Sequence, residues 1–149
     1  MMKKLWLAIP AVIITIFACS SYSEAHCEIP CGIYDDQMRL EMITEHIATV
    51  EKSVNQIKDL SDDKDKNHNQ LVRWIDNKEH HASEIQHIVS QYFLTQRIKP
   101  DDQHYEKKLG TLHRMLVYAM KCKQSLDPAN IEELRKATRE FKKLYMSKE

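Results

Sequence analysis

Residues 26–34 carry the residue types in this chain that are best suited to metal chemistry. The segment reads His-Cys-Glu-Ile-Pro-Cys-Gly-Ile-Tyr, so an imidazole, two thiols and a phenol lie close together. A candidate signal-peptidase site ends at Ala25, and cleavage there makes His26 the first residue of the mature chain. The residue types and their position therefore predict a metal-binding hook at a free N-terminus.

The donor atoms of this hook suit a square-planar ion. Cleavage exposes the α-amine of His26, and Pro30 turns the chain so that the thiolates of Cys27 and Cys31 can approach that amine. The backbone amide of Cys27, once deprotonated, lies between the amine and its own thiolate. Two nitrogens and two sulfurs in one plane favour Ni(II) or Cu(II), whereas zinc prefers a tetrahedral set. The His26 imidazole remains as an axial ligand, so the spacing indicates a one-electron redox site.

The first 25 residues have the pattern of a secretory signal peptide. Two lysines precede an apolar run over residues 5–18, and residues 23–25 (Ser-Glu-Ala) fit the cleavage position. The run is shorter than the roughly 20 residues of a membrane span. We therefore expect an exported protein, periplasmic or extracellular, with no membrane association after signal removal. Lipoprotein processing at Cys19 is the less favoured alternative, because it would leave residues ahead of His26 and block the hook.

The cysteine count leaves two interpretations of the thiols open. Cys19 departs with the signal, and the three that remain are Cys27, Cys31 and Cys122. An odd count in an exported protein indicates a free or metal-bound thiol. The alternative is a Cys27–Cys31 disulfide with Cys122 buried as a hydrophobic residue, because export favours oxidation.

The elements that must position the hook are helices. The chain has only two glycines and four prolines, and it is rich in strong helix formers. Four amphipathic segments are predicted: from the Asp35-Asp36 cap to near Leu60, from about His68 to Arg97, after a cap at Asp101 or Asp102, and from Asp127-Pro128 onward.

Apolar stripes define the inner faces of these segments. The stripes are Leu40, Ile43, Ile47, Val50, Val54 and Ile57; Leu71, Trp74, Ile75, Ala82, Ile85, Ile88, Val89, Tyr92 and Phe93; Tyr105, Leu109, Leu112, Leu116, Ala119 and Met120; and Ile131, Leu134, Thr138, Phe141, Leu144 and Tyr145. Short loops favour an all-α, antiparallel four-helix bundle over residues 35–149, preceded by the hook at 26–34 and the signal at 1–25.

Charge and the remaining polar clusters point to no second activity. The 22 basic and 22 acidic side chains cancel, so no electrostatic attraction to nucleic acid or to an anionic membrane is expected. His80, His81, Glu84 and His87 lie on one helix, and Glu84-x-x-His87 has di-iron spacing. Such a site needs a second Glu-x-x-His, and the sequence contains none. We interpret this cluster as a solvated or interface face.

The motif His26-Cys27-x-x-Pro30-Cys31-Gly32-x-Tyr34 resembles the nickel hook of the nickel-containing superoxide dismutase family. The resemblance extends over residues 26–149 through the four-helix pattern, the mature length and Tyr92-Phe93. It implies that His26 supplies its amine and imidazole, Cys27 its amide nitrogen and thiolate, and Cys31 the second thiolate. It also implies that Tyr34 stands over the open axial face and limits access to small anions.

The resemblance also implies an activity and an assembly. The expected reaction is disproportionation of superoxide to dioxygen and hydrogen peroxide by Ni(III)/Ni(II) cycling, with one nickel ion per chain and with His26 and Tyr34 in catalytic roles. Family members assemble as homohexamers of such bundles.

Three further residues are expected around the metal by the same resemblance. Glu28 stands where the family often has Asp, Glu41 matches a carboxylate that orients the axial imidazole, and Tyr92 lies near the site. The basic partner of that carboxylate would fall on His81. The leader departs from the family pattern, because known members often carry a short polar prosegment.

Two other functions account for the helices equally well. One is a non-catalytic exported chaperone or adaptor in which Cys27 and Cys31 form a disulfide, and the other is a nickel or copper carrier. The chaperone or adaptor does not explain why an imidazole, a thiol pair and a tyrosine follow the cleavage site directly. The carrier would keep the metal but would show no dismutation of superoxide.

Overall fold

The computed structural model of the chain describes residues 31–61 and 68–147, and all regular structure within these ranges is helical. The elements are α2 (Asp36–Ser61), α3 (His68–His87), η1 (Ile88–Arg97), α4 (Tyr105–Gln124) and α5 (Pro128–Met146). Since η1 continues α3 directly, the described residues form four helices, as predicted. The chain divides into two units, Met1–Cys31 and Gly32–Glu149, and the bundle belongs to the second. The predicted signal and residues 26–30 of the hook lie outside the described residues.

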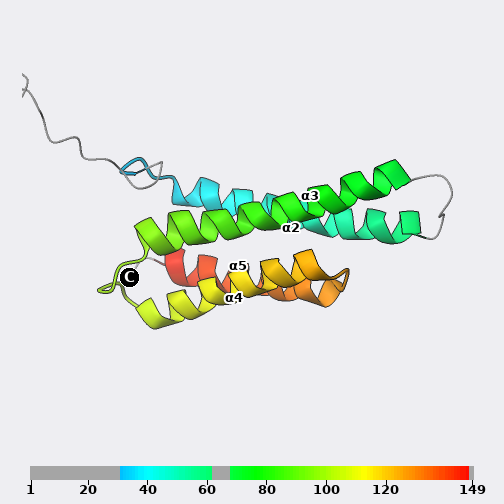
Figure 1. Cartoon of the computed structure of the whole chain (residues 1–149). Coiled ribbons are helices and arrows are strands. Elements are labelled where there is room, and N and C mark those ends of the chain that lie inside the picture. Colours follow the sequence, from blue (N-terminus) through cyan, green and yellow to red (C-terminus); the bar gives the residue numbers. More distant parts are fainter. Residues whose placement is uncertain (1–30, 62–67, 148–149) are drawn as a thin grey trace, which may run out of the picture. The chain divides into compact units, whose positions relative to one another are not determined.

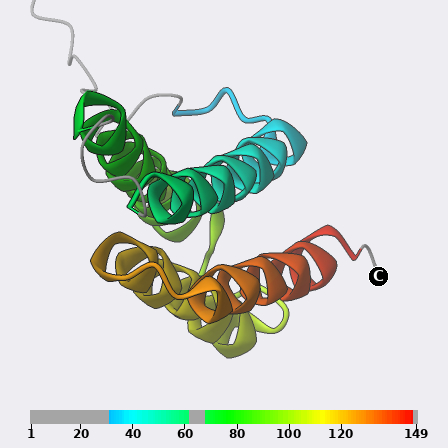
Figure 2. The same cartoon turned by 90° about the vertical axis from the view of Figure 1, so that its right-hand side faces the viewer.

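Within the second unit, the helices form two antiparallel pairs. Helix α2 lies beside α3 and α4 beside α5, with consecutive helices running in opposite directions (Figure 1). The view along the bundle shows one pair stacked on the other (Figure 2), and contacts of α3 with α4 and of α2 with α5 close the bundle. The start of α2, the end of η1 and the end of α5 therefore meet at one end of the bundle. Within the described ranges, no helix has the length and apolarity that crossing a membrane requires.

Two of the three predicted caps are confirmed. The Asp35 carboxylate accepts a hydrogen bond from the backbone N–H of Met38 at 2.9 Å, at the start of α2. Asp127 accepts from the N–H of Ala129 at 2.9 Å, and Pro128 occupies the first helical position of α5. These oxygens satisfy N–H groups that have no partner inside the helix.

The predicted cap of the third helix is wrong. Helix α4 begins after His104, which adopts a left-handed conformation with φ of 58° and makes no side-chain cap. Asp102 instead accepts from the backbone N–H of Lys99 at 3.3 Å, inside the turn that follows Pro100. Because this turn uses the carboxylate for itself, Asp102 is not available to the helix.

The end of the second helix is wider than an α-helix. Its extent to Arg97 is as predicted, but its last ten residues, η1, are π-helical. The N–H of Ile98 donates to the carbonyl of Phe93 at 3.0 Å, and the Thr95 hydroxyl donates to the carbonyl of Ser90 at 2.7 Å, each five residues back. Residues five apart point about 140° away from each other in an α-helix, and the wider turn brings them closer to one face.

A lysine of α3 forms hydrogen bonds with α4 and so links the two helix pairs. Lys78 is buried, and its ammonium donates to the carbonyl of Cys122 at 2.9 Å and to that of Lys123 at 2.5 Å. It also pairs with Glu79 at 2.7 Å. The last carbonyls of a helix lack intrahelical partners and carry the negative end of its dipole, so Lys78 satisfies the end of α4.

The core follows the predicted stripes with two exceptions. Ile75 is 41% exposed and Met120 is 40% exposed, although both were predicted to lie inside. The buried residues of α3 begin only at Lys78, because the first turns of α3 extend beyond α4 and α5 (Figure 1). Met120 lies about 100° around α4 from the buried Ala119, which turns it away from the core.

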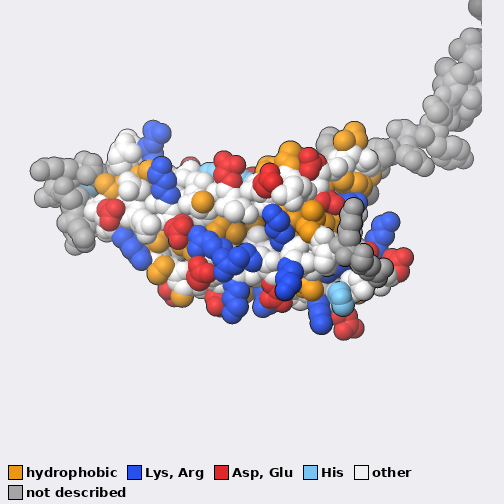
Figure 3. Space-filling view, turned by 180° about the vertical axis from the view of Figure 1, so that it is seen from behind, with side chains coloured by type: hydrophobic (Ala, Val, Ile, Leu, Met, Phe, Trp, Pro, Cys, Tyr) orange, Lys and Arg blue, Asp and Glu red, His pale blue; other side chains and the backbone are white. Residues whose placement is uncertain are grey.

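Aromatic rings fill the core at the end of the bundle where α2 begins. Phe93 is fully buried and contacts Phe141 at 5.0 Å, Tyr145 at 5.4 Å and Tyr92 at 5.0 Å between ring centroids, each edge to face. Such pairs stabilise a core beyond their buried area. This end of the bundle is therefore closely packed by aromatic rings. On the face drawn in Figure 3, acidic side chains are interspersed among Lys and Arg, as the balanced composition requires.

Candidate metal centre

Cys31 is the one predicted metal ligand that falls within residues 31–61 and 68–147. Its thiol is free and exposed, which is the form from which a metal-binding thiolate is made. The other predicted ligands, His26 and Cys27, lie outside the described residues together with Glu28. Among the residues that the structure describes, no three His, Cys, Asp or Glu side chains are placed to hold an ion.

The second described thiol has a different environment. Cys122 is buried in the core, and burial raises its pKa to about 11, with a small opposing effect of Lys78. The thiol is therefore protonated at neutral pH, which suits a packing role and not a metal ligand. The structure thus places Cys122 in the core, where sequence reasoning had it as a buried hydrophobic residue.

A glycine leads from Cys31 to the bundle. Gly32 has φ of +80°, a conformation that residues with a Cβ rarely adopt. The motif glycine therefore has a backbone reason to be glycine, since a side chain there would strain the turn that precedes Tyr34.

Tyr34 is held by two side chains of η1. The guanidinium carbon of Arg97 lies 4.3 Å from the centroid of the Tyr34 ring, and the Tyr92 ring meets it edge to face at 5.8 Å. Tyr34 is still 38% exposed. The structure thus brings together Tyr34 and Tyr92, two of the predicted site residues, and leaves part of the Tyr34 ring open to solvent.

The centre of this region is a residue that sequence reasoning treated only as a helix cap. Asp36 accepts four hydrogen bonds: from Tyr92 Oη at 2.7 Å and Arg97 Nε at 2.8 Å on Oδ1, and from Arg97 Nη2 at 2.7 Å and Tyr145 Oη at 2.9 Å on Oδ2. We call these four residues the Asp36 cluster. The partners lie 56, 61 and 109 residues from Asp36 in the chain, so no local sequence signal could have identified the cluster.

The π-helix explains how Tyr92 and Arg97 reach the same carboxylate. The two residues are five apart, and α-helical geometry would direct their side chains about 140° apart. In η1 both donate to Asp36. The geometry of the cluster therefore depends on the local winding of the helix.

The hydrogen bonds of the Asp36 cluster determine its charge state. Burial alone would raise the pKa of Asp36, but the bonds from Arg97, Tyr92 and Tyr145 outweigh it and leave that pKa lowered. Burial, followed by the bond to Asp36, raises the pKa of Tyr145 to about 12 and that of Tyr92 further. At neutral pH the carboxylate is ionised and both phenols remain protonated donors.

An open pocket of about 480 Å³ adjoins the Asp36 cluster. It is lined by Asp36, Arg97, Lys99, Asp102, Lys108, Tyr145 and Met146. Lys108 pairs with Asp102 at 3.5 Å. The lining carries three cations against two carboxylates, which is a modest excess of positive charge near Tyr34.

Glu41 and His81, the expected carboxylate and its basic partner, form hydrogen bonds with other residues and not with each other. Glu41 is exposed and accepts from Gln37 Nε2 at 2.5 Å. His81 Nδ1 lies 2.7 Å from His46 Nδ1, so the two rings share a hydrogen bond between α3 and α2. His81 therefore faces a neighbouring helix, whereas sequence reasoning treated it as part of a solvated or interface face.

The two rings of this His46–His81 pair are neutral. Burial, and then the neighbouring His81, lowers the pKa of His46, while burial and then His80 lowers that of His81. Glu84 and Glu45 oppose both shifts. One imidazole must donate and the other accept, and protonation of both rings would place two positive charges on rings whose Nδ1 atoms are 2.7 Å apart.

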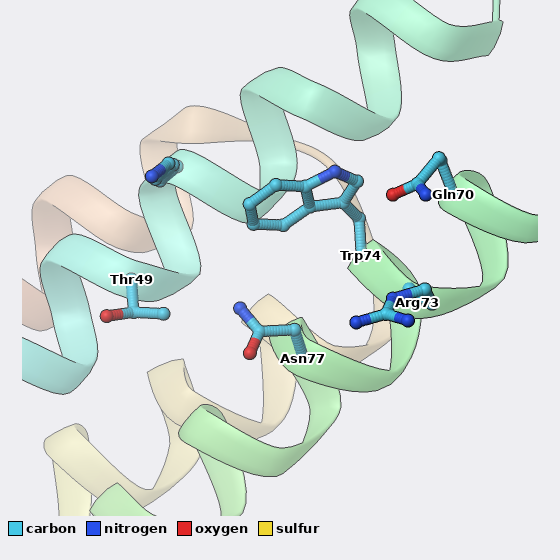
Figure 4. Close-up of a pocket in the computed structure, with 6 residues that line it drawn as sticks. Thr49, Gln70, Arg73, Trp74 and Asn77 are labelled. Carbon is cyan, nitrogen blue, oxygen red and sulfur yellow. The ribbon is translucent and has the colours of Figure 1, made fainter. Parts of the chain in front are cut away.

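A second open pocket of about 380 Å³ lies between α2 and α3. Figure 4 shows its lining side chains, which are Thr49, Lys52, Gln70, Arg73, Trp74 and Asn77. Thr49 follows Asp36 by about 20 Å along α2 at 1.5 Å per residue. The lining contains no carboxylate, thiol or imidazole, so this pocket offers none of the usual metal donors.

Comparison with known proteins supports the expectation from the hook. The family model described as nickel-containing superoxide dismutase matches residues 21–149. This range includes the complete hook and all four helices. Comparisons with curated proteins and with solved structures gave no match.

Proposed function

The chain belongs to the nickel-containing superoxide dismutase family, and from this premise we propose that it disproportionates superoxide at nickel held by its N-terminal hook. The observation that carries the proposal is the match over residues 21–149, which spans the hook and the bundle together. A helical bundle alone would support many functions.

The donor set fits nickel. His26 would supply its α-amine and imidazole, Cys27 its amide nitrogen and thiolate, and Cys31 the second thiolate. The free, exposed thiol of Cys31 is available for this role, and sulfur with amide nitrogen suits a square-planar ion. Bound there, nickel supplies one-electron chemistry between Ni(III) and Ni(II), through which one superoxide becomes dioxygen and another, with two protons, becomes hydrogen peroxide.

The residues of the bundle would select and guide the substrate. Tyr34 is partly exposed, and we assign to it the screening of the site where nickel would be held and the ordering of water there. The positive excess in the pocket beside the Asp36 cluster attracts a small anion such as superoxide. Tyr92 contacts Tyr34 edge to face and helps to set its position.

Export and assembly complete the proposal. Signal peptidase would cleave after Ala25, and this cut would expose the His26 amine that the metal needs. The mature chain would be periplasmic or extracellular, would bind one nickel ion, and would assemble as a homohexamer. N-terminal sequencing of protein from its native host should begin at His26, and a lipid-modified Cys19 would contradict the proposed site.

The decisive experiment compares two cysteine variants of the nickel-loaded protein. We expect C31S to lose both nickel and superoxide dismutation, because it removes one of the two proposed thiolate ligands. C122A is the matched control, since Cys122 is a buried thiol, and it should keep about one nickel per chain and full activity. A C31S protein with normal nickel and activity would refute the hook.

The same measurements separate the alternatives. A nickel or copper carrier would retain the metal, but superoxide would decay no faster in its presence than in the presence of the free metal ion. A chaperone or adaptor would be isolated without metal and with a Cys27–Cys31 disulfide.

A further inference from the structure

Arg97 forms a two-point ion pair with Asp36 and also contacts the ring of Tyr34. Its Nε donates to Asp36 Oδ1 at 2.8 Å and its Nη2 donates to Oδ2 at 2.7 Å. Two such bonds in parallel fix the plane of the guanidinium as well as its position. One face of that plane covers the ring of Tyr34 at 4.3 Å.

These contacts involve both ends of the short segment from Tyr34 to Asp36, which leads into α2. Tyr34 lies just ahead of α2, which begins at Asp36, so its ring is not placed by a helical backbone. Arg97 touches both Tyr34 and Asp36, and it connects this segment to the end of η1. The orientation of the Tyr34 ring therefore depends on the guanidinium.

The position of the Asp36 carboxylate depends less on Arg97 than the orientation of the Tyr34 ring does. Tyr92 and Tyr145 donate to its two oxygens at 2.7 and 2.9 Å, and both come from well-packed helices. Loss of the guanidinium would leave the carboxylate held by two phenols, while Tyr34 would lose its contact with Arg97 and keep its edge contact with Tyr92. A change at Arg97 should thus affect Tyr34 more than the fold.

We propose that Arg97 is a positioning residue for the dismutation reaction, because its Asp36-anchored guanidinium holds the Tyr34 ring in the orientation that screens the nickel. This inference rests on the proposed function of the hook. A lysine cannot replace the arginine, since an ammonium has neither the planar fork for Asp36 nor a flat face for the ring.

The test uses nickel-loaded full-length mature protein with R97K, Y34A and the double variant Y34A/R97K. R135K is the matched control: Arg135 is 30% exposed against 26% for Arg97, and it pairs with Glu51 at 2.9 Å on another part of the bundle. For each protein, nickel content, helical circular dichroism, kcat and KM for superoxide are measured.

R97K should keep its nickel and helical content but lose about tenfold in kcat with KM unchanged, as loss of an outer contact to a metal site does. R135K should match wild type. In the Y34A background, R97K should cause no further loss, because a residue that acts through Tyr34 has nothing left to position.

Four results would overturn the inference. The first is wild-type activity in R97K, and the second is a double variant whose loss of activity is the sum of the two single losses. The third is an effect on KM alone, which would indicate that Arg97 attracts the anion. The fourth is an R97K protein that fails to fold, which would make Arg97 a structural residue. Wild-type protein without nickel or without dismutation would instead refute the proposed function itself, and this inference with it.

Discussion

Replacing Asp36 by asparagine tests whether one ionised carboxylate joins three helices at the end of the bundle. D36N preserves the shape of the side chain but leaves an acceptor on one side only. Two of the four hydrogen bonds that Asp36 accepts from Tyr92, Arg97 and Tyr145 would then be lost or would have to reverse. Because this carboxylate links α2, η1 and α5 beside the aromatic core, the change should lower the free energy of unfolding of the whole bundle.

The size of the effect follows from the geometry. A hydrogen bond to a charged group contributes about 1.5–3 kcal/mol, and two are lost. Asp36 is 21% exposed, so water replaces part of that energy, and we expect a loss of about 2–4 kcal/mol at neutral pH. E140Q is the control: Glu140 pairs with Arg114 at 2.7 Å on the exposed surface, and its loss should change stability by less than about 0.5 kcal/mol.

The pH dependence separates charge from shape. The pKa of Asp36 in the folded protein lies below its ordinary value of 3.8. Its stabilising contribution is therefore complete above that value and is lost as pH falls through the folded pKa. Urea unfolding followed by circular dichroism, at one fixed chain concentration, should show the full difference between wild type and D36N at about pH 7 and a smaller one at about pH 3. A D36N protein within 0.5 kcal/mol of wild type at about pH 7 would refute the reasoning.

Two further predictions concern a buried lysine and a partly buried pair of histidines. K78M should lower the melting temperature by roughly 8–15 °C in a circular dichroism melt, because loss of the hydrogen bonds to the end of α4 costs about 2–4 kcal/mol. The control is K142M, at an exposed position of α5, which should change the melting temperature little. Equal changes in the two variants would contradict the role of Lys78. In the folded protein, the pKa values of His46 and His81 are lowered. The contribution of this pair to the free energy of unfolding is therefore complete above the ordinary histidine pKa of 6.5, and it declines as pH falls below that value. Urea midpoints between about pH 7.5 and about pH 5.5 should fall more steeply in wild type than in an H46Q/H81Q variant, and parallel slopes would show that the pair is not protonation-sensitive.

Local patterns predicted the helices well because each pattern has a local cause. The steps of three and four between apolar residues placed Leu40, Ile43 and Ile47 in the core. The Asp127-Pro128 dipeptide located the start of α5, where the carboxylate accepts from a nearby backbone N–H. The residue types of the hook led to the family that the comparison then identified.

The errors of sequence reasoning have tertiary causes. The stripes that contained Ile75 in α3 and Met120 in α4 were correct in period, but the width of each buried face depends on where the neighbouring helices end and how they approach. Asp102 was expected to cap α4, yet the turn after Pro100 uses its carboxylate first. His81 was interpreted as part of a solvated or interface face, and its partner His46 could not be identified from local spacing because it belongs to another helix.

By itself, the sequence determined the all-α class, the order and approximate limits of the helices, and the chemistry available at residues 26–34, since these depend on neighbours within a few residues. Only the tertiary structure decided that Asp36 binds Tyr92, Arg97 and Tyr145 and that Arg97 covers Tyr34. Those contacts join positions as many as 109 residues apart, and they require a π-helical turn that no apolar period predicts. A side chain acquires such partners only when helix packing brings distant elements together.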